Sequence, residues 1–493
     1  MREHIVRSIG VGGLSLLLLL GAPFGAPAQQ GELAGGLGVF VDPPRARRPA
    51  RPRERAVSAS PRKYTPRRAR GRSTPAPSPA STPVAEATPS PRRTPPVTAE
   101  ALNERAEAAI TAGRFADALE PLRQAVRLKP DFADAQYNLG FALASTGDHA
   151  GAVGPLQRAA QLDPQDAEAY EQLASSFTKL GRHAEAAAAF EQVDRLKPPD
   201  PDTLYALGVA REASGDADRA IEAFRRAVSL RPDHAEALFD LGDALYAKGR
   251  YPEAADAYRQ VARLTPLNAE AHENHGDAAR AAGRFPEASA AYREAARLRP
   301  ADADVRHHLG YSLGRERKWQ EAAAALRESL RLRPDSNEAA VNLAWVLNNS
   351  GQFQESIDTL TRVIARQPDL PDAHFNLGVA YGRLAQAGGR KDAEKKTLLG
   401  QAVGSFTQAV RLRPDWAEAH NNLGFALGST GRFKEAIAAH VEAVRLKPDY
   451  AGALFNLAYA YRRNGDRKQA MQVYQQLTAL NPGLAQKLYP LIK

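Results

Sequence analysis

Asparagine side chains recur along the chain at a fixed interval, and their chemistry suits the binding of an extended peptide. A carboxamide carries two N–H donors and a carbonyl acceptor, so a row of them can hold a peptide backbone without reading its side chains. The recurring asparagines are Asn138, Asn342, Asn376, Asn422 and Asn456. The aromatic residues in adjacent columns are Trp345, Phe375, Phe425, Phe455 and Tyr459. Amides beside aromatics are typical of a peptide-binding surface.

Carboxylates occupy the same columns in an earlier part of the chain. They are Glu171, Asp240, Asp243, Glu273 and Asp277. A row of negative charge favours positively charged ligands. We therefore expect an acidic half that prefers basic ligands and a later half that binds extended peptides.

Residue patterns for catalysis are weak. The chain has no cysteine, which excludes thiolate zinc sites and cysteine nucleophiles. It has no Gly-Lys dipeptide and hence no P-loop for nucleotide phosphates. The segment from His272 to His275 lacks the His-Glu-x-x-His spacing of zinc proteases, and Ser176 with Lys179 matches Ser-x-x-Lys by chance, inside a repeat. We expect a protein that is not an enzyme and that holds no cofactor or metal.

These columns exist because one unit is repeated about eleven times. A proline recurs every 34 residues, apart from one step of 46 residues. An aspartate often follows the proline, as Asp131 does, and we expect it to cap the first helix of the unit. A recurring glycine, such as Gly283, marks the end of that helix, and a second helix with apolar i, i+3, i+4 spacing follows. The prolines are Pro130, Pro164, Pro198, Pro232, Pro266, Pro300, Pro334, Pro368, Pro414, Pro448 and Pro482.

Two further columns hold small residues at points where the helices of a unit must pack closely. One column is mostly glycine, as at Gly242 and Gly424, and the other is almost always alanine, as at Ala254. A glycine inside a helix costs about 1 kcal/mol relative to alanine. Its recurrence therefore requires a packing reason, and close approach of the second helix supplies one.

The repeat pattern resembles the tetratricopeptide repeat family over residues 99–482. The resemblance implies an all-α, right-handed superhelical solenoid of about eleven helix-turn-helix units, whose first helices line a concave groove. It also implies that the asparagines face this groove, in an array similar to the repeat region of O-GlcNAc transferase but without a catalytic domain. Such amides are expected to be solvated until a ligand binds. The alternative is that the asparagines bond to neighbouring turns and the aromatics pack between units.

Two segments depart from the repeat. The insertion at 385–398 lengthens the ninth unit by twelve residues, which indicates either longer helices around a basic hairpin or a tolerated surface insertion. The tail at 483–493 carries Leu484, Leu488 and Leu491, which offer one apolar face. A solenoid needs its ends covered, so we expect a capping helix there.

Residues 1–28 have the three parts of a secretory signal peptide. Arg2 and Arg7 make the start positive, residues 9–20 are apolar, and Ala26 and Ala28 are small residues suited to a cleavage site. The apolar stretch is shorter than the ~20 residues needed to span a bilayer. We expect an exported protein, periplasmic or secreted, and an uncleaved signal that tethers the protein to a membrane is the alternative.

Residues 29–98 are rich in proline and arginine, and we expect a disordered linker. This segment holds fourteen Lys/Arg and four Asp/Glu, a difference of +10 that equals the net charge of the whole chain. Its basic stretch at 45–72 suits an anionic polymer or lipid headgroups, and a solvated spacer is the alternative. We do not expect nucleic acid as a partner.

Together these features predict an exported, non-enzymatic scaffold that binds protein or peptide segments in a concave groove. Two other functions stay open. One is an envelope-attached assembly factor that uses the basic arm, and the other is a regulatory subunit of an enzyme on another chain.

Overall fold

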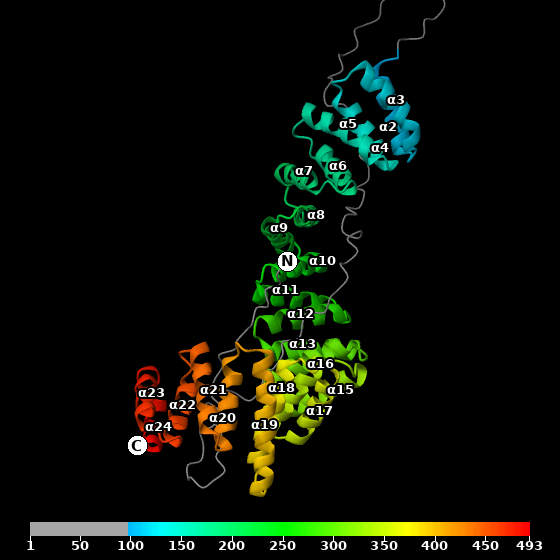
Figure 1. Ribbon diagram of the computed structural model, residues 1–493. Helices are drawn as coiled ribbons and strands as arrows, with labels where there is room; N and C mark the ends of the chain where they lie inside the picture. Colours follow the sequence, from blue (N-terminus) through cyan, green and yellow to red (C-terminus); the bar gives the residue numbers. More distant parts are fainter. Residues whose placement is uncertain (1–96) are drawn as a thin grey trace, which may run out of the picture. The chain divides into compact units, whose positions relative to one another are not determined.

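The computed structural model describes residues 97–493, and this part of the chain consists of helices joined by short turns, without a strand (Figure 1). The predicted signal peptide at 1–28 and nearly all of the predicted linker at 29–98 lie outside the described residues. Among the described residues, no helix is both long enough and apolar enough to cross a membrane. The predicted all-α solenoid of helix pairs is confirmed.

Each repeat contributes two helices joined by a short turn, which we call its first and second helix. The first helices are α2 (Ala99–Thr111), α4 (Ala133–Ser145), α6 (Ala167–Lys179), α8 (Pro201–Ala213), α10 (Ala235–Ala247), α12 (Ala269–Ala281), α14 (Ala303–Arg315), α16 (Asn337–Ser350), α18 (Pro371–Gln386), α20 (Ala417–Ser429) and α22 (Ala451–Arg463). The second helices are α3 (Phe115–Leu128), α5 (His149–Leu162), α7 (His183–Leu196), α9 (Ala217–Leu230), α11 (Tyr251–Leu264), α13 (Phe285–Leu298), α15 (Trp319–Leu332), α17 (Phe353–Arg366), α19 (Asp392–Leu412), α21 (Phe433–Leu446) and α23 (Arg467–Leu480). A last helix, α24 (Pro482–Ile492), follows them.

The turns between helices explain where each helix ends and the next begins. The predicted glycine column has a left-handed backbone, with a φ of 74° at Gly283, which lets the chain reverse between the two helices of a repeat. Arg317 takes this place in repeat 7, with a φ of 61°. The prediction that these aspartates cap the first helices is wrong by one residue. Where an aspartate follows the proline, it lies in the turn, and the next residue is the N-cap. Asp131 thus lies in the turn, and the N-cap of α4 is Phe132.

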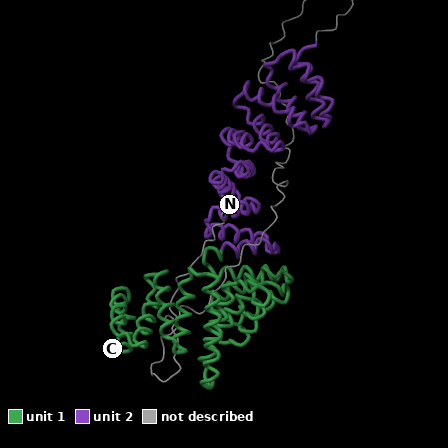
Figure 2. The backbone as a smooth tube through the Cα atoms, in the orientation of Figure 1, with its two compact units in different colours: residues 1–46, 279–493 green, residues 47–278 purple. Residues whose placement is uncertain are grey.

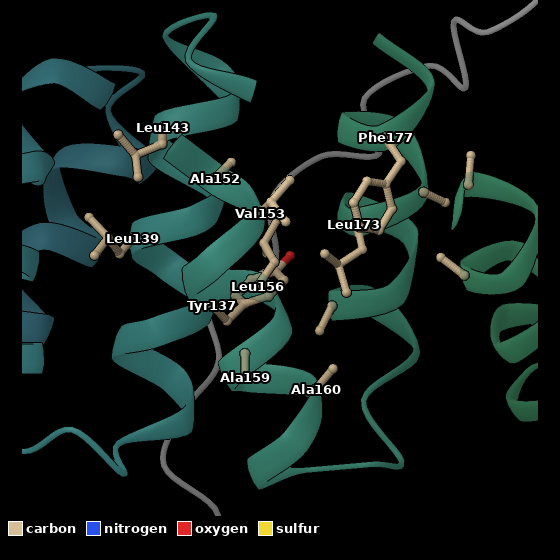
Figure 3. Close-up of a cluster of buried hydrophobic side chains, with 14 of the residues drawn as sticks. Tyr137, Leu139, Leu143, Ala152, Val153, Leu156, Ala159, Ala160, Leu173 and Phe177 are labelled. Carbon is tan, nitrogen blue, oxygen red and sulfur yellow. The ribbon is translucent and has the colours of Figure 1, made fainter. Parts of the chain in front are cut away.

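Within a repeat, the two helices pack closely at the glycine column. A Cβ atom placed on Gly242 would lie 2.7 Å from the ring of Tyr258, closer than real Cβ contacts. In this repeat, glycine therefore leaves room for the ring of Tyr258 on the second helix. Between these contacts, leucines fill the layers of the solenoid, as Leu139, Leu156 and Leu173 do around α4, α5 and α6 (Figure 3). The small-residue packing predicted from the sequence is confirmed.

The described helices form two compact units, which we call the N-terminal unit (97–278) and the C-terminal unit (279–493) (Figure 2). In each unit, helices that follow one another in the chain pack together. Neighbouring first helices also contact each other, as α2 does with α4 in the N-terminal unit and α14 does with α16 in the C-terminal unit. Neighbouring second helices approach one another less. We call the side of each unit that is formed by its first helices the inner face.

The two segments that interrupt the repeat form regular helices. At the insertion, α18 and α19 are 16 and 21 residues long, and Gly389, with a φ of 85°, lies between them. At the end of the chain, α24 packs on α22 and α23 and buries Leu484, Leu488 and Ile492. Leu491, which we expected on this face, is exposed. Ala485 is buried as well, so the buried face covers one side of the helix and Leu491 falls just outside it.

Candidate functional site

Side-chain hydrogen bonds join neighbouring first helices on the inner face. Each bond links the residue that precedes the asparagine column in one repeat to the column residue of the next repeat, 35 positions later. The pairs are Asn103 with Asn138 (2.9 Å), Tyr205 with Asp240 (2.9 Å), His307 with Asn342 (2.9 Å) and Asn421 with Asn456 (3.0 Å). The column therefore forms rungs between repeats as well as a line of polar groups along the helices.

The predicted asparagines are buried, which corrects one expectation. Asn138, Asn342 and Asn376 have no exposed surface, and Asn422 and Asn456 are 4% and 7% exposed. The expectation that these amides are solvated without a ligand is wrong, because neighbouring first helices enclose them. A rung of this kind contributes to stability, since an unsatisfied buried partner costs about 1–3 kcal/mol.

Asn422 differs from the other members of the column. Its Nδ2 atom is buried and has no hydrogen-bond partner. On α16, the Oδ1 atom of Asn348 is likewise buried without a partner, while its Nδ2 donates to the backbone oxygen of Asn376 at 3.1 Å. Asn348 lies outside the column, so the sequence pattern did not point to it. Asn422 and Asn348 thus add an unsatisfied donor and an unsatisfied acceptor to the first helices of the C-terminal unit, and native proteins rarely leave such groups unpaired.

The predicted aromatic residues divide into core and surface. Phe375 is 1% exposed and stacks on Trp416, with ring centroids 4.4 Å apart. Phe455 is also buried, in the core of the last repeats. For these two residues the packing alternative holds. Trp345, Phe425 and Tyr459 are half-buried, so part of each ring remains accessible to a ligand.

The predicted acidic residues are engaged inside the N-terminal unit. Glu171 forms an ion pair with Lys197 at 2.7 Å, Asp240 accepts the Tyr205 bond described above, and Asp243 accepts a hydrogen bond from the hydroxyl of Tyr258. Glu273 and Asp277 are buried, with 3% and 0% of their surfaces exposed. The fold therefore engages Glu171, Asp240 and Asp243 internally and encloses Glu273 and Asp277, although the Oδ2 atom of Asp277 has no hydrogen-bond partner.

Charge is distributed very unevenly between the two compact units. Residues 97–278 hold 19 Lys/Arg and 30 Asp/Glu, a difference of −11, whereas residues 279–493 hold 31 Lys/Arg and 21 Asp/Glu, a difference of +10. The near-neutral total for the repeats therefore conceals two oppositely charged units. Long-range attraction of a charged ligand depends on this local charge and not on the total.

Two histidines of the C-terminal unit are deeply buried. Burial lowers the pKa of His307 and of His440 to about 3, so both imidazoles are neutral at physiological pH. His307 bonds to Asn342 as a rung. Within residues 97–493, no group of three or more histidine and acidic side chains is placed to hold a metal ion.

Comparisons with known families identify the repeat. Two family models, both described as tetratricopeptide repeat, match the chain. The first matches overlapping stretches that span residues 103–201 and 205–390, and the second matches residues 429–489. Together they cover more than half of the chain. No curated protein matches.

Several solved structures are similar over parts of the chain. A fragment of MamA from Desulfovibrio magneticus RS-1 is 25% identical, covers 34% of this chain and 96% of its own, and has a TM-score of 0.31. Yeast Tom70 is 15% identical, with coverages of 79% and 93% and a TM-score of 0.35. A chain of the APC/C hetero-tetramer Cut9-Hcn1 is 14% identical, with coverages of 79% and 95% and a TM-score of 0.38.

Proposed function

Because the chain belongs to the tetratricopeptide repeat family, whose members are typically non-catalytic scaffolds, we propose that it is an exported scaffold that holds extended protein segments on the inner face of its C-terminal unit. Export is supported by the signal-like residues 1–28. The choice of the C-terminal unit is supported by the unpaired Nδ2 of Asn422 and by the accessible rings of Trp345, Phe425 and Tyr459.

The unsatisfied amide of Asn422 is the observation that carries this proposal. A buried N–H group without a partner costs about 1–3 kcal/mol, and a peptide carbonyl would supply the missing acceptor once the carboxamide rotates toward it. Phe425 lies three residues later and therefore on the same face of α20. An amide that binds backbone and a ring that packs against side chains together suit an extended segment.

The test is a binding assay with defined peptides on the full chain. We would label extended peptides of about 15 residues, long enough to span several repeats, with fluorescein. The peptides have one common sequence with prolines at fixed positions, and they differ only in carrying Glu, Gln or Lys at the same variable positions. Asn422→Ala should weaken peptide binding about three- to tenfold, the value of one net hydrogen bond.

The matched control is Asn138→Ala, which changes the same column in the N-terminal unit. This variant should bind the peptides normally but melt at a lower temperature, because it breaks a rung. Asn422→Ala should melt like the original protein or slightly higher, because no protein hydrogen bond to its Nδ2 is lost. If Asn422→Ala binds every peptide normally, or if no peptide binds the original protein, the proposal is wrong.

The charge of residues 29–98 favours a second role at an anionic surface. Their +10 excess lies next in the chain to the acidic N-terminal unit, so binding of the arm to anionic lipid competes with self-attraction. Deleting residues 45–72 should reduce binding to vesicles that contain anionic lipid, and the remaining binding should depend less on salt. Equal binding with and without residues 45–72 would leave the arm as a spacer.

A further inference from the structure

Three arginines occupy one column of the inner face in alternate repeats of the C-terminal unit. They lie seven residues after the asparagine column, on α14, α18 and α22 of repeats 7, 9 and 11. Positions i, i+3 and i+7 share one face of a helix, so each arginine continues the line set by the column residue and the residue three positions later. The first line is His308, Tyr311 and Arg315, and the second is Asn376, Val379 and Arg383. The third is Asn456, Tyr459 and Arg463.

The middle residue is tyrosine in the first and third lines, at Tyr311 and Tyr459, and valine in the second, at Val379. Where it is tyrosine, it helps to fix the arginine. The guanidinium of Arg315 donates to the Tyr311 hydroxyl at 2.9 Å and lies 4.3 Å from the ring centroid of Phe285. A guanidinium has five N–H donors in a planar fork, and stacking leaves less side-chain freedom to lose when an anion binds.

Repeat 11 reproduces this arrangement with different residues. The guanidinium of Arg463 donates to the Tyr459 hydroxyl at 3.2 Å and lies 5.1 Å from the ring centroid of Phe433. In both repeats the aromatic ring comes from the second helix of the preceding repeat, 26 residues before the tyrosine. The same construction on two separate helices indicates that the direction of these arginines is set by the repeat.

Arg383, in repeat 9, is the least compensated of the three. Within residues 97–493, no ion pair or side-chain hydrogen bond holds its guanidinium, although the residue is only partly exposed. Burial lowers its pKa, which means that the surroundings disfavour its positive charge. A desolvated charge is costly unless it is paired, and a ligand carboxylate would pair it.

The acidic residues on this face of the unit lie one turn before the asparagine column, at Asp304, Glu338, Asp372 and Glu418. Three of them are paired, Asp304 with Arg333, Asp372 with Arg413 and Glu418 with Lys447. In repeats 7 to 11, neither the asparagine column nor the positions one before it and three, six and seven after it contain an acidic residue. In the N-terminal unit the same columns contain Glu104, Glu107, Glu171, Glu212, Asp240, Asp243, Glu273 and Asp277. At these columns the two inner faces therefore differ in charge, in agreement with the net charges of the units.

We propose that Arg315, Arg383 and Arg463 make the C-terminal unit selective for acidic extended segments, whose carboxylates they bind while Asn422 holds the backbone and the rings contact its apolar side chains. This inference rests on the proposed function and adds the chemical class of the partner. The basic arm of the chain itself does not fit this face, because like charges repel. Lysine is a poorer choice for such a site, since it lacks the bidentate fork that matches a carboxylate.

The experiment compares the Glu, Gln and Lys peptides described above on the full chain at low and moderate salt. The Glu peptide should bind about tenfold more tightly than the Gln peptide, and this preference should shrink as added salt screens the charges. Arg383→Gln should remove most of the preference for the Glu peptide and leave the affinity for the Gln peptide unchanged. Arg383→Lys should restore the preference only in part.

The matched control is Arg445→Gln, which removes the same charge from the second helix α21. Arg445 is exposed and paired with Glu442, so this variant should change the affinity for every peptide less than twofold. Should Arg383→Gln fail to fold, Arg463→Gln tests the same row at an exposed position. Equal affinity for the Glu and Gln peptides, or equal effects of the row and control variants, overturns the selectivity while leaving the proposed function intact. Failure of all three peptides to bind overturns both.

Discussion

His440 is predicted to make the C-terminal repeats sensitive to acid. It lies on α21, in the core column that faces the glycine of the first helix, and a Cβ atom on Gly424 would lie 2.7 Å from its ring. The side chain is 2% exposed, and its Nδ1 atom has no hydrogen-bond partner. Other repeats place leucine, phenylalanine or tyrosine at this position, as at Leu156, Phe224 and Tyr258. The test variant is therefore His440→Leu.

The size of the effect follows from the shift in pKa. Burial lowers the pKa of folded His440 from 6.5 to about 3. Below the unfolded value of 6.5, the unfolded chain takes up a proton that the folded chain does not, so stability falls as the pH decreases toward 3. At about pH 4.5 this amounts to ~2.7 kcal/mol lost relative to neutral pH, from about 1.4 kcal/mol per pH unit.

Urea denaturation, followed by tryptophan fluorescence, measures the difference between the original protein and His440→Leu at about pH 7 and about pH 4.5. His307 has a similarly lowered pKa, so both proteins should lose stability in acid. The variant should lose ~2–3 kcal/mol less than the original protein over this interval. Equal losses in both proteins would show that His440 does not remain neutral in the folded state, and the reasoning from its burial would be refuted.

Three further substitutions test the packing described above. Gly242→Ala should destabilise the protein by about 1–3 kcal/mol, because its Cβ overlaps the ring of Tyr258. Gly428→Ala should be neutral or stabilising, because the nearest atom to its Cβ is 3.8 Å away. Equal melting shifts for the two variants would contradict the assigned packing. Arg317→Gly should raise stability by about 1 kcal/mol, because it relieves a left-handed backbone in repeat 7, and a lower urea midpoint would count against this. Asn138→Ala should cost about 1–3 kcal/mol by breaking its bond to Asn103, and an unchanged melting temperature would show that the rungs do not hold the repeats together.

The features that repeat within one unit could be read from the sequence. The period, the helix pairs, the turn glycines and the close packing at positions such as Gly242 depend on residues a few positions apart, and their physical reason is local. The predicted N-cap was one residue too early, because aspartate is common both in turns and at helix N-caps. The type of residue at Asp131 is compatible with both positions, and the backbone puts it in the turn.

The features that link one repeat to the next could not be read in the same way. The partner of Asn138 is Asn103, and the partner of Asn342 is His307, so the bonded column changes residue type from repeat to repeat. Each of these partners precedes the asparagine column and is unremarkable within its own unit. The unsatisfied groups of Asn422 and Asn348 depend on which neighbours fail to reach them, and that is decided by the packing of side chains across several helices.

The measurement that tests the central claim most directly is the position of a bound peptide on the C-terminal unit. A photo-crosslinking group placed within the Glu peptide, followed by mass spectrometry, identifies the residues that it contacts. We predict crosslinks to the first helices α14, α16, α18, α20 and α22, near Trp345, Phe425 and Tyr459, and their loss when unlabelled Glu peptide competes. Crosslinks confined to the second helices or to the N-terminal unit would contradict the claim that the inner face of residues 279–493 binds extended segments.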